Sequence, residues 1–137
     1  MRGVKFNPGT SVEDNQRFTA RVITVRSGAT VRVRNRGRTQ DPHTLSLVRK
    51  GQLPTGFDPQ GCPVGGPLME AHRANQETGE VGVPLVDVGA EGFDQPGDSQ
   101  FIPPRQGISF QVTAPRGREL SYFCVVHPWM HGEIRVR

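Results

Sequence analysis

Residues 122–132 read YFCVVHPWMHG, and this stretch carries most of the chemical information in the chain. A thiol, an imidazole and a thioether occur in it with the spacing Cys124-x-x-His127-x-x-Met130. A soft thiolate, a neutral imidazole and a weakly held thioether suit copper in both of its oxidation states, provided that a second imidazole comes from elsewhere. The stretch therefore predicts part of a copper site on one tight turn.

The second imidazole is available at His43, which opens the alternating segment 44–48. Two His, one Cys and one Met complete a trigonal site with a long fourth bond. His131, directly after Met130, is an alternative axial ligand that would make a harder, more tetragonal site. We expect His131 instead to be an exposed residue on the turn into the last strand.

Alternation of apolar and polar residues on both sides of this stretch predicts a β domain. Val31 and Val33 fall on one face of their segment, and the arginines between and after them fall on the other, which is the period of a half-buried strand. Short strands separated by Gly-containing turns indicate a sandwich or barrel. The expected strands are 18–25, 30–35, 44–48, 108–112 and 134–136.

The pattern stops between about residues 51 and 107, where eleven of the 17 Gly and eight of the 12 Pro lie. We interpret this segment as a long, loop-rich insertion, which in a compact domain usually has a function or packs on the body. Its one helical signal is the segment 68–75, closed by Asn75. The insertion contains eight acidic and two basic residues, so it is opposite in sign to the rest of this chain of net charge +4. We expect it to cover one end or face of the sandwich with its acids in solvent.

Length and composition set the remaining limits. The chain has 137 residues, which suits a single domain spanning 1–137. No apolar run is long enough for a membrane span, so we expect no direct membrane insertion of this chain. A basic body with an acidic insertion makes a poor nucleic-acid groove, and we expect no nucleic-acid partner.

With these residues in place, the sequence resembles the cupredoxins, the small blue (type 1) copper proteins, and its ligand loop is most similar to those of amicyanin and plastocyanin. The likeness covers roughly residues 18–50 and 106–137. It implies an all-β, Greek-key β-sandwich of about eight strands, here with the insertion at about 51–107 containing a short helix. It also implies one copper ion, cycling between Cu(I) and Cu(II), with His43, Cys124, His127 and Met130 as metal ligands.

The resemblance implies a one-electron carrier and not an enzyme. Redox partner proteins, an electron donor and an acceptor, are expected to dock near His127, Pro128 and Trp129, and the chain is expected to be a monomer. An extracytoplasmic location follows, periplasmic or at the cell surface or secreted, with the signal or anchor absent from this chain. One departure from the family is Val126, where related loops usually have Pro; its N–H is a possible hydrogen-bond donor to the Cys124 sulfur.

Two other classes remain open at this stage. A copper-dependent enzyme or enzyme domain would use the insertion for an acidic ligand such as Glu70 or for a substrate pocket, whereas four protein ligands leave no open position. A copper chaperone or store fits less well, because such proteins tend to use paired Cys or Met-rich tracts.

The two remaining candidates for metal binding are Cys62 and His72, both in the insertion. They are ten residues apart, and no second pair of zinc ligands is left once Cys124 and His127 are assigned. We therefore expect Cys62 to be a buried or free thiol and His72 a surface helix residue. The count of two Cys alone allows a disulfide between Cys62 and Cys124, but the surroundings of Cys124 argue against it.

Overall fold

A computed structural model describes residues 9–12, 18, 20–36, 42–53, 65–73, 85–89, 91–127 and 129–137. Their strands and helices follow in chain order. They are β1 (Gly9–Val12), β2 (Val22–Val25), β3 (Thr30–Asn35), β4 (His43–Val48), the 3-10 helix η1 (Lys50–Gln52), α1 (Gly65–Ala71), β5 (Asp87–Val88), β6 (Ser99–Ile102), β7 (Gly107–Gln111), β8 (Glu119–Phe123) and β9 (His131–Val136).

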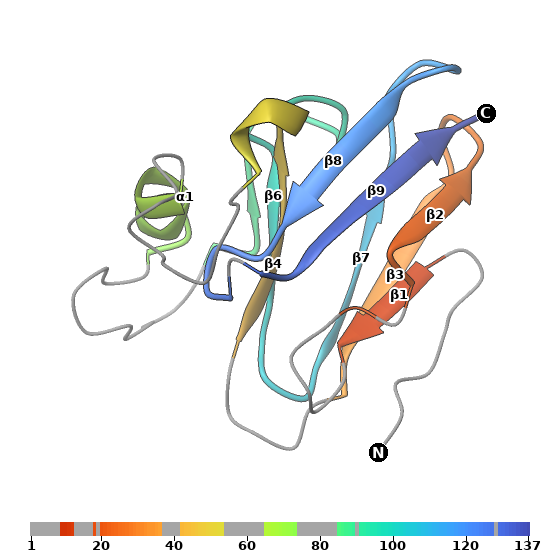
Figure 1. The fold of residues 1–137 in the computed structure, drawn as a ribbon. Coiled ribbons are helices and arrows are strands. Elements are labelled where there is room, and N and C mark those ends of the chain that lie inside the picture. The colour runs from red at the N-terminus through yellow and green to blue at the C-terminus, as the bar shows by residue number, and fades with distance from the viewer. Residues whose placement is uncertain are drawn as a thin grey trace.

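The strands form two sheets, one with the order β1-β3-β7 and one with the order β2-β9-β8-β4-β6-β5 (Figure 1). The pairs β1–β3 and β2–β9 are parallel, and the other pairs are antiparallel. One apolar core joins the sheets, since Val31 and Phe110 of the small sheet pack in the same cluster as Leu45, Leu47 and Ile134 of the large one. The predicted all-β sandwich is confirmed.

The alternation predicted from sequence decides which residues face this core. In β3 every second residue is buried, with Val31 and Val33 inward and the arginines outward. Ile134 and Val136 of β9 are inward in the same way. The first expected strand, 18–25, is shorter than predicted: β2 begins at Val22, after a bend at Arg21.

The insertion contributes more to the large sheet than its sequence indicates. It contains β5 and β6, and β6 lies between β4 and the edge strand β5 of the large sheet. All four residues of β6 are buried, without alternation. Its polar side chains are tolerated there because they are hydrogen-bonded: Ser99 Oγ lies 2.6 Å from Ser46 Oγ, and Gln100 Nε2 donates to Asp87 Oδ1 at 2.7 Å.

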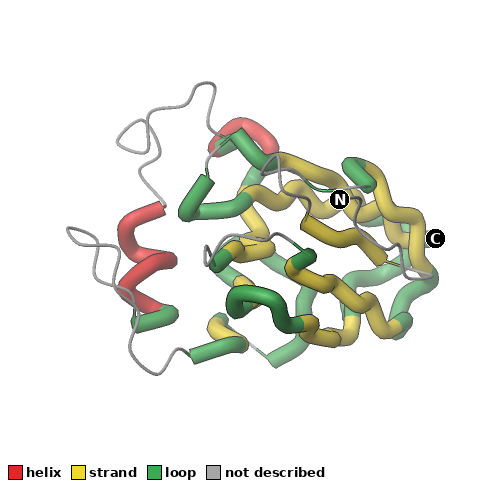
Figure 2. The backbone as a smooth tube through the Cα atoms, turned by 90° about the horizontal axis from the view of Figure 1, so that it is seen from below, coloured by secondary structure: helices red, strands yellow, loops and turns green. Residues whose placement is uncertain are grey.

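Helix α1 lies outside the two layers of strands (Figure 2) and is the expected short helix of the insertion. It begins three residues earlier than predicted and ends at Ala71, close to Arg73, whose φ of 65° is left-handed and incompatible with continuing the helix. Asn75 lies outside the described residues. Leu68 of α1 packs with Val48, Phe123 and Val125, and we call these four residues the outer cluster. The outer cluster covers the side of β4 and β8 that faces away from the core.

Neither of the described helices has the length and hydropathy of a membrane span.

Candidate metal centre

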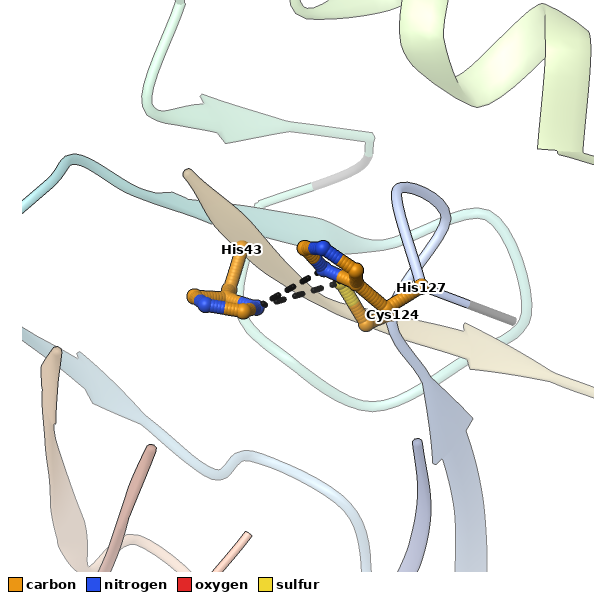
Figure 3. Close-up of side chains that lie close together, drawn as sticks. All are labelled: His43, Cys124 and His127. Atoms are coloured by element: carbon orange, nitrogen blue, oxygen red, sulfur yellow. Dashed lines mark hydrogen bonds between the residues drawn. The ribbon is translucent and has the colours of Figure 1, made fainter. Parts of the chain in front are cut away.

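Three of the four predicted ligands meet at one end of the large sheet. His43 Nδ1 and His127 Nδ1 lie 3.1 Å apart, and each lies 3.8 Å from Cys124 Sγ. In Figure 3 the two imidazoles and the thiol converge on one point between β4 and the loop that follows β8. Residues from positions 43, 124 and 127 therefore form a single group of donor atoms.

Strand pairing in the sheet and backbone hydrogen bonds in the loop fix this geometry. β4 pairs with β8, with Ser46 opposite Phe123, so the first residue of β4 lies near the end of β8. Two backbone hydrogen bonds then close the loop: Cys124 N–H donates to Met130 O at 3.0 Å, and Met130 N–H donates to His127 O at 2.9 Å. The spacing of Cys124, His127 and Met130 is thus the spacing of a closed turn.

Met130 and His131, the two candidates for the axial position, have different surroundings. Met130 is 2% exposed and belongs to the core cluster that contains Cys124. His131 is half-buried rather than exposed, so that expectation was wrong, and its Nε2 contacts no hydrogen-bond partner among the described residues. Because Gly132 faces the core at Tyr122, the alternation of β9 directs His131 to the opposite side, where it is paired with Phe123.

The sulfur of Cys124 is shielded from solvent, and backbone amide groups are directed toward it. The residue is fully buried, and burial raises the pKa of the Cys124 thiol. The backbone amides of Thr44, His127 and Val126 act in the opposite direction on that pKa, because they favour the thiolate. The Thr44 N–H donates to Sγ at 3.3 Å.

The donor set fits a copper ion. Metal bonds of about 2.0 to 2.3 Å in a trigonal arrangement separate neighbouring N and S ligands by about 3.5 to 3.7 Å. The two N–S distances of 3.8 Å are close to this range, and the N–N distance of 3.1 Å is shorter. Two imidazoles and one thiolate are the equatorial set of blue copper sites. Within the part of the chain that the structure describes, this is the one group of at least three His, Cys, Asp or Glu side chains able to hold a metal ion. Glu70, considered above as an acidic ligand, is exposed on α1 and does not belong to it.

His72 is placed differently from the sequence-based expectation. It is 1% exposed, and its ring nitrogens contact Leu85 O and Ser99 Oγ, so it is not a surface residue. Its pKa is lowered by desolvation, against smaller opposing effects of the Leu85 carbonyl and the Asp87 carboxylate. The sequence carries no signal for this burial, because a His at the end of a short, weakly amphipathic helix is usually exposed. Cys62 lies outside the described residues, and Cys124 is a free thiol.

The outer edge of the centre is partly apolar. His127 is half-buried, and its ring meets the Trp129 ring edge-on with 5.2 Å between centroids. Trp129 is 38% exposed, one of few large apolar side chains at the surface of the described chain. Pro128, also expected near the docking surface, lies outside the described residues.

Comparisons with known proteins bear on the fold. No protein-family model and no curated protein sequence matches the chain. Solved structures do match. Auracyanin from Roseiflexus castenholzii is 16% identical over 94% of each chain, with a TM-score of 0.53. The fold is that of the cupredoxins.

Two further cupredoxin structures are similar over nearly their whole length. A purple cupredoxin from Nitrosopumilus maritimus is 12% identical over 95% of this chain and 99% of its own, with a TM-score of 0.52. Auracyanin A from Chloroflexus aurantiacus is 17% identical over 94% and 99%, with a TM-score of 0.51. Both relatives therefore match this chain over nearly the full length of each partner.

Proposed function

We propose that this cupredoxin-fold chain is a mononuclear type 1 copper protein that carries single electrons between redox partners, in one domain formed by residues 1–137. The observation that carries the proposal is the convergence of Cys124 Sγ with the Nδ1 atoms of His43 and His127 at a buried position. Auracyanin A, which has a similar fold, is described as a blue copper protein, and this supports the same class of function here.

In this proposal Met130 would be the fourth ligand of the copper ion. Its burial beside Cys124 supports that role, and the orientation of His131 toward the other side of the sheet argues against His131 as a competitor. A bound copper ion would supply one-electron chemistry by alternating between Cu(II) and Cu(I). The protein holds the donors in place through the closed loop and keeps water from the sulfur, so that the same ligands serve both states.

We further propose that electrons enter and leave through the edge of His127, and that donor and acceptor proteins dock there. The half-exposed Trp129 beside the imidazole supports this, because exposed aromatic side chains are enriched at protein interfaces. The proposal includes a monomeric protein in an extracytoplasmic location, as is common for thiolate copper proteins of this fold.

The test is the optical and electron paramagnetic resonance spectrum of the protein after addition of Cu(II). We expect one bound copper ion and the intense thiolate-to-copper band of a closed Cys/His/His/Met site. Cys124→Ser should abolish the band, and the matched variant Cys62→Ser should retain it. A pale protein that binds azide, or a band that is lost in the second variant and kept in the first, would contradict the proposal and favour an open, enzymatic copper site.

A further inference from the structure

A row of buried polar side chains connects helix α1 to the metal centre. His72 Nε2 lies 2.7 Å from Ser99 Oγ, which lies 2.6 Å from Ser46 Oγ, which lies 2.9 Å from Thr44 Oγ1. All four residues are at most 1% exposed. We call them the hydroxyl row.

The donor and acceptor of every hydrogen bond in the hydroxyl row follow from the His72 end, which is remote from the metal centre. The carbonyl oxygen of Leu85 only accepts, so the proton of the neutral His72 ring is on Nδ1 and Nε2 is an acceptor. Ser99 must then donate to His72. Ser46 in turn donates to Ser99, and Thr44 donates to Ser46.

The near end of the row is part of the metal centre. Thr44 follows the ligand His43, and its Oγ1 accepts a hydrogen bond at 2.9 Å from the N–H of Val125, the residue after Cys124. The N–H of Thr44 donates to Cys124 Sγ. Because the Thr44 hydroxyl proton is directed to Ser46, its oxygen lone pairs are left for Val125. The orientation of the Thr44 hydroxyl therefore depends on the imidazole ring of His72, which lies in the insertion.

Attachment of the helix alone does not require such an arrangement. The outer cluster already attaches α1 to the sheet through Leu68 and Phe123, and apolar residues in place of the hydroxyl row would extend that cluster. Burying polar groups costs free energy unless each one is hydrogen-bonded, and a chain of them restricts its members to one geometry.

We propose that His72 is a positioning residue for the copper centre, acting through Ser99 and Ser46 on Thr44 and so on the Cys124 turn. This inference rests on the copper site proposed above. His72 acts in its neutral form, because an imidazolium would donate from both nitrogens and reverse the row, and the Thr44 hydroxyl would then no longer donate to Ser46. Asp87 on β5 faces His72 and favours the charged form, whereas burial under α1 against Phe101 of β6 disfavours it.

The experiment compares four variants of the full chain. His72→Phe fills the site but removes both ring nitrogens, and Ser99→Ala interrupts the hydroxyl row without changing the helix. His72→Gln keeps one donor and one acceptor. Leu68→Ala is the matched control, because it loosens α1 in the outer cluster without touching the hydroxyl row.

Two properties are measured for each variant. In the copper-free protein, NMR follows the hydrogen exchange rate of the Val125 amide. In His72→Phe and Ser99→Ala we expect this rate to rise at least tenfold, after correction for any change in the global unfolding equilibrium. In the copper-loaded protein we expect the same two variants to lower the midpoint potential and shift the thiolate-to-copper band, because the Thr44 N–H then donates less well to the sulfur. His72→Gln should remain close to the parent protein.

The outcomes separate the two proposals. If the parent protein shows no thiolate-to-copper band, the copper site itself is wrong. If the band is present and Leu68→Ala changes exchange, potential and band as much as His72→Phe, His72 only anchors the helix, and the inference is overturned. Unchanged exchange and potential in Ser99→Ala overturn it as well, and this variant also decides the matter should His72→Phe not fold.

Discussion

Gly132, the second residue of β9, lies against the ring of Tyr122 on β8. A Cβ at this position would overlap the ring, which is fully buried and unable to move aside. We expect Gly132→Ala to lower the free energy of unfolding by about 1 to 3 kcal/mol, as overpacked cores do. Urea unfolding measures this loss. Gly51→Ala is the control, since its Cβ would meet open space, and equal effects of the two changes would contradict the argument.

The Val126 amide is one of the backbone groups that favour the Cys124 thiolate. Val126→Pro removes that N–H, which places more electron density on the sulfur and favours Cu(II). A hydrogen bond of about 0.5 to 1.5 kcal/mol corresponds to about 20 to 60 mV for one electron, so we expect the midpoint potential to fall by that amount. Cyclic voltammetry measures it, and the visible spectrum shows whether the ligands remain in place. An unchanged or higher potential would exclude the hydrogen bond.

The individual residues also show where sequence reasoning succeeds and fails. Cys124 and His127 were predictable because their spacing on one loop is local, and His43 because a strand-opening imidazole was needed to complete a copper site. The hydroxyl row was not predictable. Thr44 and Ser46 alternate with Leu45 and Leu47, a pattern that normally places hydroxyls in solvent, whereas here they are buried against distant segments, Ser46 at Ser99 and Thr44 at Val125.

At the scale of elements, helix α1 makes stability depend on pH through His72. Its pKa is lowered in the folded state, so the unfolded chain binds the proton more readily. The stabilisation that neutral His72 contributes is complete above the pKa of the unfolded chain, about 6.5. It is lost as the pH falls through the lower pKa of the folded state, at up to about 1.4 kcal/mol per pH unit. Urea unfolding between pH 7.5 and 5 should show a smaller decrease in His72→Gln. An equal decrease in both proteins would mean that His72 is protonated in the folded state.

Strand β6 shows why the sequence pattern predicts a loop-rich insertion. Its sequence SQFI has neither alternation nor a continuous apolar run, so the two patterns that indicate strands are both missing. The strand exists because polar partners come from distant elements: Ser46 for Ser99, and Asp87 for Gln100. Such pairing is decided by the tertiary fold and leaves no local signature.

At the scale of the whole molecule, charge is distributed unevenly. Arg26, Arg116 and Arg137 are exposed together at the end where β2 and β9 finish, away from α1 (Figure 1). The exposed acids Glu70 and Asp87 lie on α1 and β5, and α1 packs beside the Cys124 turn. Because the insertion as a whole carries eight acidic and two basic residues, we expect a small ion approaching His127 to meet a local charge opposite in sign to the net charge of +4.

This division predicts how oxidation rates depend on salt. With the reduced copper protein, the rate of oxidation by the cation tris(phenanthroline)cobalt(III) should fall as ionic strength rises, and the rate with the anion hexacyanoferrate(III) should rise. Stopped-flow measurements from about 0.01 to 0.5 M salt cover the range in which the Debye length shrinks from about 30 Å to a few Å. The opposite slopes would show that the net charge, and not the acidic insertion, controls approach.

The position of β9 also has a consequence for how the protein is made. The last strand of the chain lies between β2 and β8, and its residues 133–136 pair in parallel with residues 22–25. The large sheet therefore has a gap until β9 has left the ribosome, and long-range pairings of this kind fold slowly, in about milliseconds to seconds. His43 is synthesised long before Cys124 and His127, so a nascent chain that ends between them holds only one ligand of the proposed centre. At the proposed centre, metal capture therefore requires that the Cys124 turn has already been synthesised.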